Sequence, residues 1–195
     1  ASKVILILFS GPKNRPDGLA AYLKMAGFDC VLVDFDPKHG GGPEDNILDD
    51  RVYARLLEDV KSGKFAAIFA APPCSTFSVA RHFESQGKDP GPPPVRSRSH
   101  HRCLPDLPPA RKEEARRANE IVGRTAALLL TGWRVGSEFI LENPADHGDP
   151  ALHRLFLTEE HAPLWLMAEI KALAKLSKAG TVTFPQCELG APWQK

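Results

Sequence analysis

KVILILF, at residues 3–9, places six apolar side chains in succession. Such an uninterrupted, largely branched run is typical of a β-strand that is buried on both faces. Cys30–Val33 and Phe65–Ala71 repeat the pattern, Glu138–Leu141 predicts a fourth strand, and Thr181–Phe184 predicts a short fifth one. Strands of this kind belong to parallel sheets that are covered by helices on both sides.

Helical patterns separate these runs. In Asp50–Lys61 the apolar residues recur three or four positions apart, which indicates one buried helix face. Further helices are expected at Asp17–Met25 with Asp17 as N-cap, at Ala110–Thr131, at Pro150–Leu157 and at Leu164–Lys178. The alternation predicts an α/β fold with a doubly wound, mostly parallel sheet. We expect a single domain over residues 1–195, with ligands at the carboxyl ends of its strands.

Composition narrows the class of protein. The net charge of +1 gives no sign of a nucleic-acid partner, so any basic surface must be local. Four cysteines without a CxxC pair fit neither a zinc site nor a disulfide framework, and we expect reduced thiols inside a cell. No apolar run reaches the ~18 residues that cross a bilayer, so no membrane partner is expected. We expect the chain to be a piece of a longer polypeptide.

The segment PPCSTFS, at residues 72–78, places Cys74 directly after the third predicted strand. If a helical turn follows, its peptide dipoles favour the thiolate, which is the nucleophilic form of cysteine. The alternative is a buried structural cysteine that happens to follow a Pro-Pro turn.

PPCSTFS resembles the PPCxxFS motif of the DNA cytosine-C5 methyltransferases. Further likenesses to that family follow in the family's order along the chain: Phe9-Ser10-Gly11, Asp34-Phe35-Asp36, Glu142-Asn143-Pro144 and Pro185-Gln186. The resemblance implies the Rossmann-like fold of S-adenosylmethionine-dependent methyltransferases and a covalent reaction on cytosine in DNA, with RNA not excluded. We expect no counterpart of the family's separate target-recognition domain within these residues.

In the chemistry that the resemblance implies, Cys74 adds to C6 of a cytosine that has been turned out of its duplex. Glu142, in a partly buried position, holds the N3 side of the base, and C5 then takes the methyl group from S-adenosylmethionine. Asn143 orders the loop around the nucleophile.

The resemblance also assigns binding residues. The cofactor side comprises Phe9, Ser10, Gly11, Asp34, Phe35 and Pro72, with Asp45 or Asn46 toward the adenine. The base side comprises Pro73, Ser78 and Gln186. Arg96 belongs to a basic loop, residues 81–117, that we expect to contact phosphates, the alternative being a solvated Pro-rich loop. His82, His100, His101 and Cys103 fit no common zinc spacing, so no metal is expected.

Two departures from the family keep other functions open. Lys13-Asn14 stands where the family's cofactor loop has two glycines, and neither arginine of the family's Gln-x-Arg-x-Arg motif follows Gln186. A catalytically degenerate domain that only binds nucleic acid or S-adenosylmethionine is therefore the first alternative. A cysteine hydrolase is the second, and it requires a histidine base beside Cys74.

Overall fold

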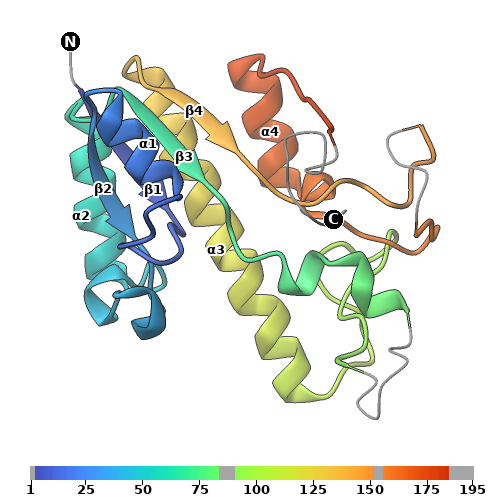
Figure 1. Cartoon of the computed structure of the whole chain (residues 1–195). Coiled ribbons are helices and arrows are strands. Elements are labelled where there is room, and N and C mark those ends of the chain that lie inside the picture. The colour runs from blue at the N-terminus through green and yellow to red at the C-terminus, as the bar shows by residue number, and fades with distance from the viewer. Residues whose placement is uncertain (1–2, 84–90, 152–155, 185–195) are drawn as a thin grey trace.

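A computed structural model describes residues 3–83, 91–151 and 156–184. Its sheet contains β1 (Val4–Leu8), β2 (Asp29–Val33), β3 (Ala67–Ala70) and β4 (Glu138–Leu141) in the order β2-β1-β3-β4 (Figure 1). Every pairing is parallel, and Leu8 lies opposite both Val33 and Ala70. The predicted α/β class and parallel sheet are confirmed.

Four α-helices accompany the sheet: α1 (Leu19–Met25), α2 (Asp50–Lys61), α3 (Pro109–Arg134) and α4 (Ala168–Ser177). Figure 1 shows α1 on one side of the sheet and α2 with α3 on the other. The alternation of side chains along β2 agrees with this arrangement. Cys30 contacts the Ala20 carbonyl of α1, whereas Val31 and Val33 pack into the core beneath α2 and α3. The sheet is therefore covered from both sides.

The two sides are packed very differently. Leu6, Leu8 and Ile68 form the main core with apolar residues of α2 and α3, among them Leu56 and Leu128. On the other side, α1 buries none of its seven residues, and the β4 side chain Ile140 is 61% exposed. Most of the apolar surface removed from water thus lies between the sheet and α2 and α3, and that packing is the main source of stability.

Helix boundaries follow local chemistry where a cap is present. Asp49 accepts hydrogen bonds from the amides of Arg51 and Val52, and α2 covers the residues that the sequence predicts. The expected cap of α1 is wrong, because Gly18 holds the N-cap position while the Asp17 carboxylate pairs with Arg15 at 2.7 Å.

Three further expectations are corrected. Thr181–Phe184 pairs with no described strand, and its side chains Val182 and Phe184 are exposed. Residues 150, 151, 156 and 157 are turn or irregular structure instead of helix, and residues 152–155 of the expected helix lie outside the described residues. The helix expected over Leu164–Lys178 is split, because Met167 is extended and buried between a 3-10 turn (Leu164–Leu166) and α4.

Within the described ranges, no helix is long and apolar enough to cross a membrane.

Candidate active site at the carboxyl edge of the sheet

The strand order reverses between β1 and β3, which makes this the topological switch point of the sheet. From β1 the chain passes to β2 on one side, and β3 then pairs with β1 on its other side. Loops that leave two such strands diverge, and ligands of doubly wound sheets bind in the space between them. Phe9–Gly11 follow β1 and Pro72–Cys74 follow β3, so both sequence motifs lie at this switch point.

Hydrogen bonds tie the loops after β3 and β4 together. The Glu142 amide donates to the Ala70 carbonyl at 2.9 Å, and the Asn143 side-chain amide donates to the Pro72 carbonyl at the same distance. Asn143 thereby reaches the chain two residues before Cys74. The sequence-predicted nucleophile and carboxylate thus lie at the ends of neighbouring strands, with Asn143 as the bridge.

Cys74 is half-buried and belongs to neither apolar cluster of the protein. It precedes a 3-10 turn (Ser75–Phe77), and its carbonyl accepts a hydrogen bond from the Phe77 amide at 2.8 Å. Before it, Pro72 is buried and Pro73 is exposed. The turn is shorter than a full helix, so its peptide dipoles act on the thiol less strongly than those of a helix would.

Glu142 is exposed, in contrast to the partly buried position that the resemblance implies. It follows β4, which is the last strand of the sheet, and this edge position leaves its carboxyl group open to solvent. The backbone after it is held firmly, because Trp165 Nε1 donates to the Pro144 carbonyl at 2.8 Å. Ser78 Oγ accepts from the Ala80 amide at 3.2 Å and so caps a turn beside the site.

The loop after β1 has a strained backbone. Phe9 has φ +60°, a left-handed conformation that bulky residues rarely adopt, and its amide donates to the Val33 carbonyl at 2.7 Å. The Ser10 amide reaches the same carbonyl at 3.2 Å. Gly11 has φ +66° and donates its amide to Asp34 Oδ2 at 2.8 Å. Strain that the surroundings hold in place is a common feature of ligand sites.

Asp34 forms hydrogen bonds that hold together the loops at this switch point. Its Oδ2 accepts from Gly11, and its Oδ1 accepts from the Asp36 amide at 2.9 Å and lies 3.1 Å from His39 Nδ1. Gly41 packs directly on the Asp34 backbone, since a Cβ at Gly41 would lie 1.5 Å from that carbonyl oxygen. Beside this buried carboxylate, the Phe35 side chain is 51% exposed and faces solvent at the strand end.

The acids of the next loop also contact the protein itself. Asp45 is buried and pairs with Lys13 Nζ at 2.5 Å, while Asn46 Oδ1 accepts from the Leu48 amide at 3.1 Å. Lys13 thus links the loop after β1 to the segment before α2. Both side chains that the resemblance offers to an adenine are engaged within the chain.

Arg96 differs most from its expected role. The residue is 2% exposed, so its guanidinium cannot reach a phosphate on the surface. Arg98 binds Asp146 through two 2.8 Å hydrogen bonds, and Arg102 pairs with Glu169. Much of the basic loop therefore serves to hold the protein together.

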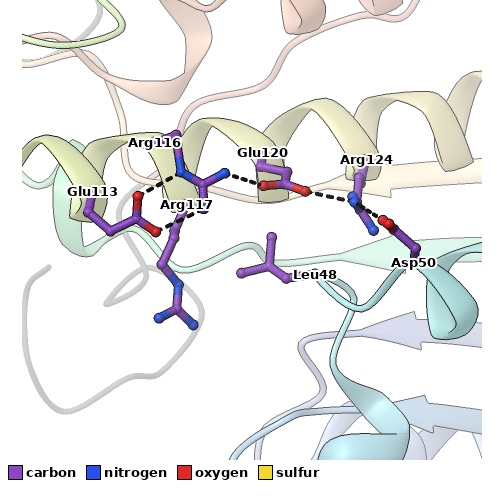
Figure 2. Close-up of a pocket in the computed structure, with 7 residues that line it drawn as sticks. All are labelled: Leu48, Asp50, Glu113, Arg116, Arg117, Glu120 and Arg124. Carbon is purple, nitrogen blue, oxygen red and sulfur yellow. Dashed lines mark hydrogen bonds and ion pairs between the residues drawn. The ribbon is translucent and has the colours of Figure 1, made fainter.

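A ladder of ion pairs runs along α3 (Figure 2). The pairs are Glu113–Arg116, Arg116–Glu120, Glu120–Arg124 and Arg124–Asp50, at 2.5 to 2.9 Å. Figure 2 shows the guanidinium of Arg117 apart from this ladder. Arg117 is exposed and makes no ion pair with a described residue.

Arg117 also lines a hollow of about 380 Å³ between α3 and the residues that flank Cys74. Pro73, Ser75 and Thr76 form one wall of the hollow, and Ala118 and Ile121 belong to the other. A cation without an ion-pair partner in the described ranges thus lies beside the turn that carries the cysteine.

No family model, curated protein or solved structure matches the chain. The site is therefore interpreted from its own geometry and from the sequence motifs. Gln186, the remaining residue assigned to the base side, lies outside the described residues.

Sequence reasoning missed a buried polar cluster behind the site. His161 Nε2 lies 2.8 Å from the Phe77 carbonyl, and its Nδ1 accepts from the His147 amide at 3.0 Å. The ring is therefore a neutral tautomer with its proton on Nε2. Burial lowers the pKa of His161 below the ordinary value of 6.5. The sequence signal for this role was absent, because His161 lies far from Phe77 along the chain.

Asp146 anchors the same cluster. Burial acts to raise the pKa of this carboxyl group, but hydrogen bonds from Arg98 and the Gly148 amide outweigh burial and hold the pKa below its usual value. A charged pair of Arg98 and Asp146 thus fixes the segment after β4 against the loop after β3.

Proposed function

We propose that this chain is a methyltransferase domain that transfers a methyl group from S-adenosylmethionine to C5 of cytosine in DNA through a covalent adduct with Cys74. The observation that carries the proposal is the hydrogen bond from Asn143 to Pro72. It couples the loop of a half-exposed cysteine to the loop of an exposed carboxylate at adjacent strand ends. Neighbouring strands lie about 5 Å apart, so the two loops leave the sheet side by side.

The groups at the switch point between β1 and β3 suit a nucleoside cofactor. A carboxylate has about four acceptor positions, and three of those on Asp34 are used by Gly11, Asp36 and His39. The remaining position on Oδ2 suits one ribose hydroxyl group. Phe35 adds an exposed aromatic ring for the adenine. The bound cofactor would supply an electrophilic methyl group.

The chain's own residues perform the remaining steps. The Cys74 thiolate forms a bond from Sγ to C6, and the electron pair of the C5–C6 double bond moves toward C5. Glu142 holds the N3 side of the ring by a hydrogen bond and stabilises the charge that develops there. After C5 is methylated, its proton leaves to a base and the Sγ–C6 bond breaks, which regenerates the thiolate.

Local charge supports a nucleic-acid substrate in spite of the low net charge. Arg117 is exposed, lacks an ion-pair partner among the described residues, and borders the hollow beside the Cys74 turn. Glu113 and Glu114 line the same hollow, but each of them is already paired with another arginine. Arginine in such a position neutralises a backbone phosphate. The target base must leave the stack to reach Cys74, because neither ring face is accessible within a duplex.

A labelled methyl-transfer assay on matched DNA and RNA duplexes tests the proposal. We expect the intact protein to methylate cytosine C5 in DNA, Cys74→Ser to abolish the reaction, and Cys103→Ser to retain it. Cys103 is a matched control because it is also free and half-buried. Absence of transfer by the intact protein, or full activity of Cys74→Ser, would overturn the proposal. Methyl transfer to RNA alone would show that the substrate is RNA instead of DNA.

A second candidate is a degenerate domain that keeps the fold without turnover. The internal bonds of Asp34 and the Lys13–Asp45 pair favour it, since polar groups expected to hold the cofactor are occupied by the protein. Calorimetric titration with S-adenosylmethionine separates the two functions. Micromolar binding together with methyl transfer excludes the degenerate domain, whereas binding without transfer supports it.

A cysteine hydrolase has little support from the geometry. Both ring nitrogens of His161 contact backbone atoms, and no hydrogen bond joins Cys74 to a histidine among the residues described. Among the described residues, no histidine is therefore held by a hydrogen bond in the position of the general base that such an enzyme requires.

A further inference from the structure

The turn that carries Cys74 is held from its buried side by Arg96. The guanidinium donates from Nε to the Thr76 carbonyl at 3.1 Å and from Nη2 to Thr76 Oγ1 at 2.9 Å. It also stacks on the Phe77 ring, with 3.9 Å from Cζ to the ring centroid. One side chain thus contacts the backbone, the hydroxyl group and the aromatic ring of two consecutive turn residues.

The other end of the guanidinium fixes Arg96 itself. Nη1 donates to the His101 carbonyl at 2.7 Å and to Asn119 Oδ1 on α3 at 3.0 Å. These contacts come from a neighbouring loop and from the longest helix of the protein. The Cys74 turn is thereby connected to a rigid element through a single buried residue.

The charge of Arg96 is balanced in an unusual way. Among the described residues it forms no ion pair, and all its oxygen partners are neutral carbonyl, hydroxyl or amide groups. Burial lowers the pKa of Arg96 to about 10, which still leaves it charged at neutral pH. Burying a cation without a carboxylate is costly, and the cost is offset only if every donor is well satisfied. Such an arrangement holds its acceptors in one geometry.

We propose that Arg96 is a positioning residue, which acts through Thr76 to fix the direction in which Cys74 presents its thiol. This inference rests on the proposed role of Cys74 as nucleophile. It also gives Arg96 a function different from the phosphate contact that its sequence position suggests. His161 supports the same turn independently, because its Nε2 donates to the next carbonyl, that of Phe77.

The test uses a matched pair of substitutions at Thr76 in the full chain. Thr76→Val keeps the shape of the buried side chain but removes the hydroxyl acceptor of Arg96 Nη2, whereas Thr76→Ser keeps that acceptor. Arg96→Gln removes the charge and most of the donors. Circular dichroism melting verifies that each variant is folded, and Thr76→Val keeps the test decisive if Arg96→Gln does not fold.

Two rates at Cys74 are measured for each variant. The first is the rate of adduct formation with a DNA duplex containing 5-fluorocytosine, in which fluorine replaces the C5 proton that must leave, so that the adduct is trapped. The second is alkylation by iodoacetamide, resolved by peptide mass spectrometry with Cys30 of β2 as internal reference. A small electrophile needs only an accessible thiol, whereas the adduct needs a thiol aimed at the base.

If Arg96 positions Cys74, the two rates change in opposite directions. In Thr76→Val, adduct formation slows by about tenfold or more, because a small misplacement of a reacting atom has an effect of this size. Alkylation of Cys74 rises about threefold as the turn loosens, and Thr76→Ser stays within about twofold of the intact protein in both rates. Unchanged rates in Thr76→Val, or equal losses in Thr76→Val and Thr76→Ser, would overturn the inference.

The alkylation rate also separates this inference from the proposed function. If the intact protein forms no adduct, the proposed methyl transfer fails, and the Cys74 alkylation rates alone decide the role of Arg96. A threefold rise in Thr76→Val without a rise in Thr76→Ser then supports it, and equal rates contradict it.

Discussion

Asn143 is the residue through which the loops after β3 and β4 meet. Asn143→Asp keeps the shape of the side chain, but it removes the donor to the Pro72 carbonyl and places two acceptors together. We expect methyl transfer to fall by about tenfold or more and the free energy of unfolding to fall by about 1 kcal/mol. Asn14→Asp, in an exposed position, is the control. Equal losses in both variants would show that Asn143 has no special role.

Gly41 is another single residue on which the site depends. A Cβ there would lie 1.5 Å from the Asp34 carbonyl oxygen, so Gly41→Ala forces two loops apart. We expect the free energy of unfolding to fall by about 3 kcal/mol or more, measured by urea denaturation. Gly123→Ala is the matched control, because nothing lies within 4 Å of its new Cβ and it is within α3. That change should stabilise the protein by up to about 1 kcal/mol.

At the scale of elements, α3 combines packing with a charged outer face. Arg116 is held by Glu113 and Glu120, whereas Arg117 is exposed without an ion pair to any described residue. Arg117→Gln should weaken DNA binding and lower the slope of log K against log salt by about one. Arg116→Gln should change the slope much less. Fluorescence anisotropy over a salt series measures both, and equal slopes for Arg117→Gln and the intact protein would contradict the phosphate contact.

The segment between β4 and α4 contributes a pH-dependent element. His161 faces Asp146, His147, His82 and Arg98, and burial keeps its folded pKa below 6.5. In the unfolded chain His161 takes up a proton as the pH falls through about 6.5, so the unfolded state binds more protons in this window. Stability is therefore fully present above that pH and decreases below it.

Urea titrations at about pH 7.5 and 5.5 measure this effect. His161→Gln keeps a donor for the Phe77 carbonyl but cannot titrate, so we expect it to show a shallower decrease than the intact protein. Burial also lowers the pKa of His82, which leaves a residual decrease in the variant. The lowered pKa of Asp146 acts only at more acidic pH, below 3.8. An equally steep decrease in the stability of His161→Gln would show that His161 is not the source of the pH dependence.

At the scale of the whole molecule, strand order explains why distant motifs converge. Because β1 lies between β2 and β3, and β4 adds beside β3, the loops that follow these strands share one edge of the sheet. The sequence predicts this outcome well, since the runs at Lys3–Phe9 and Phe65–Ala71 are long, apolar and uninterrupted. Asp49 likewise marks the start of α2 through a local cap.

Predictions that depend on distant partners were less successful. Thr181–Phe184 has a strand-like composition, but a strand needs an edge to pair with, and composition does not reveal one. Arg96 looks like a phosphate ligand in the sequence because nothing nearby shows that Thr76 and Asn119 surround it. The exposure of Glu142 depends on β4 being the edge strand, which the sequence alone does not specify.

The central claim is that Cys74 attacks cytosine. Incubation of the full chain with S-adenosylmethionine and a 5-fluorocytosine DNA duplex, followed by proteolysis and mass spectrometry, tests it most directly. The account predicts one nucleotide attached to the peptide that contains Cys74, and no attachment in Cys74→Ser. An intact protein that forms no adduct, or an adduct on another residue, would contradict it.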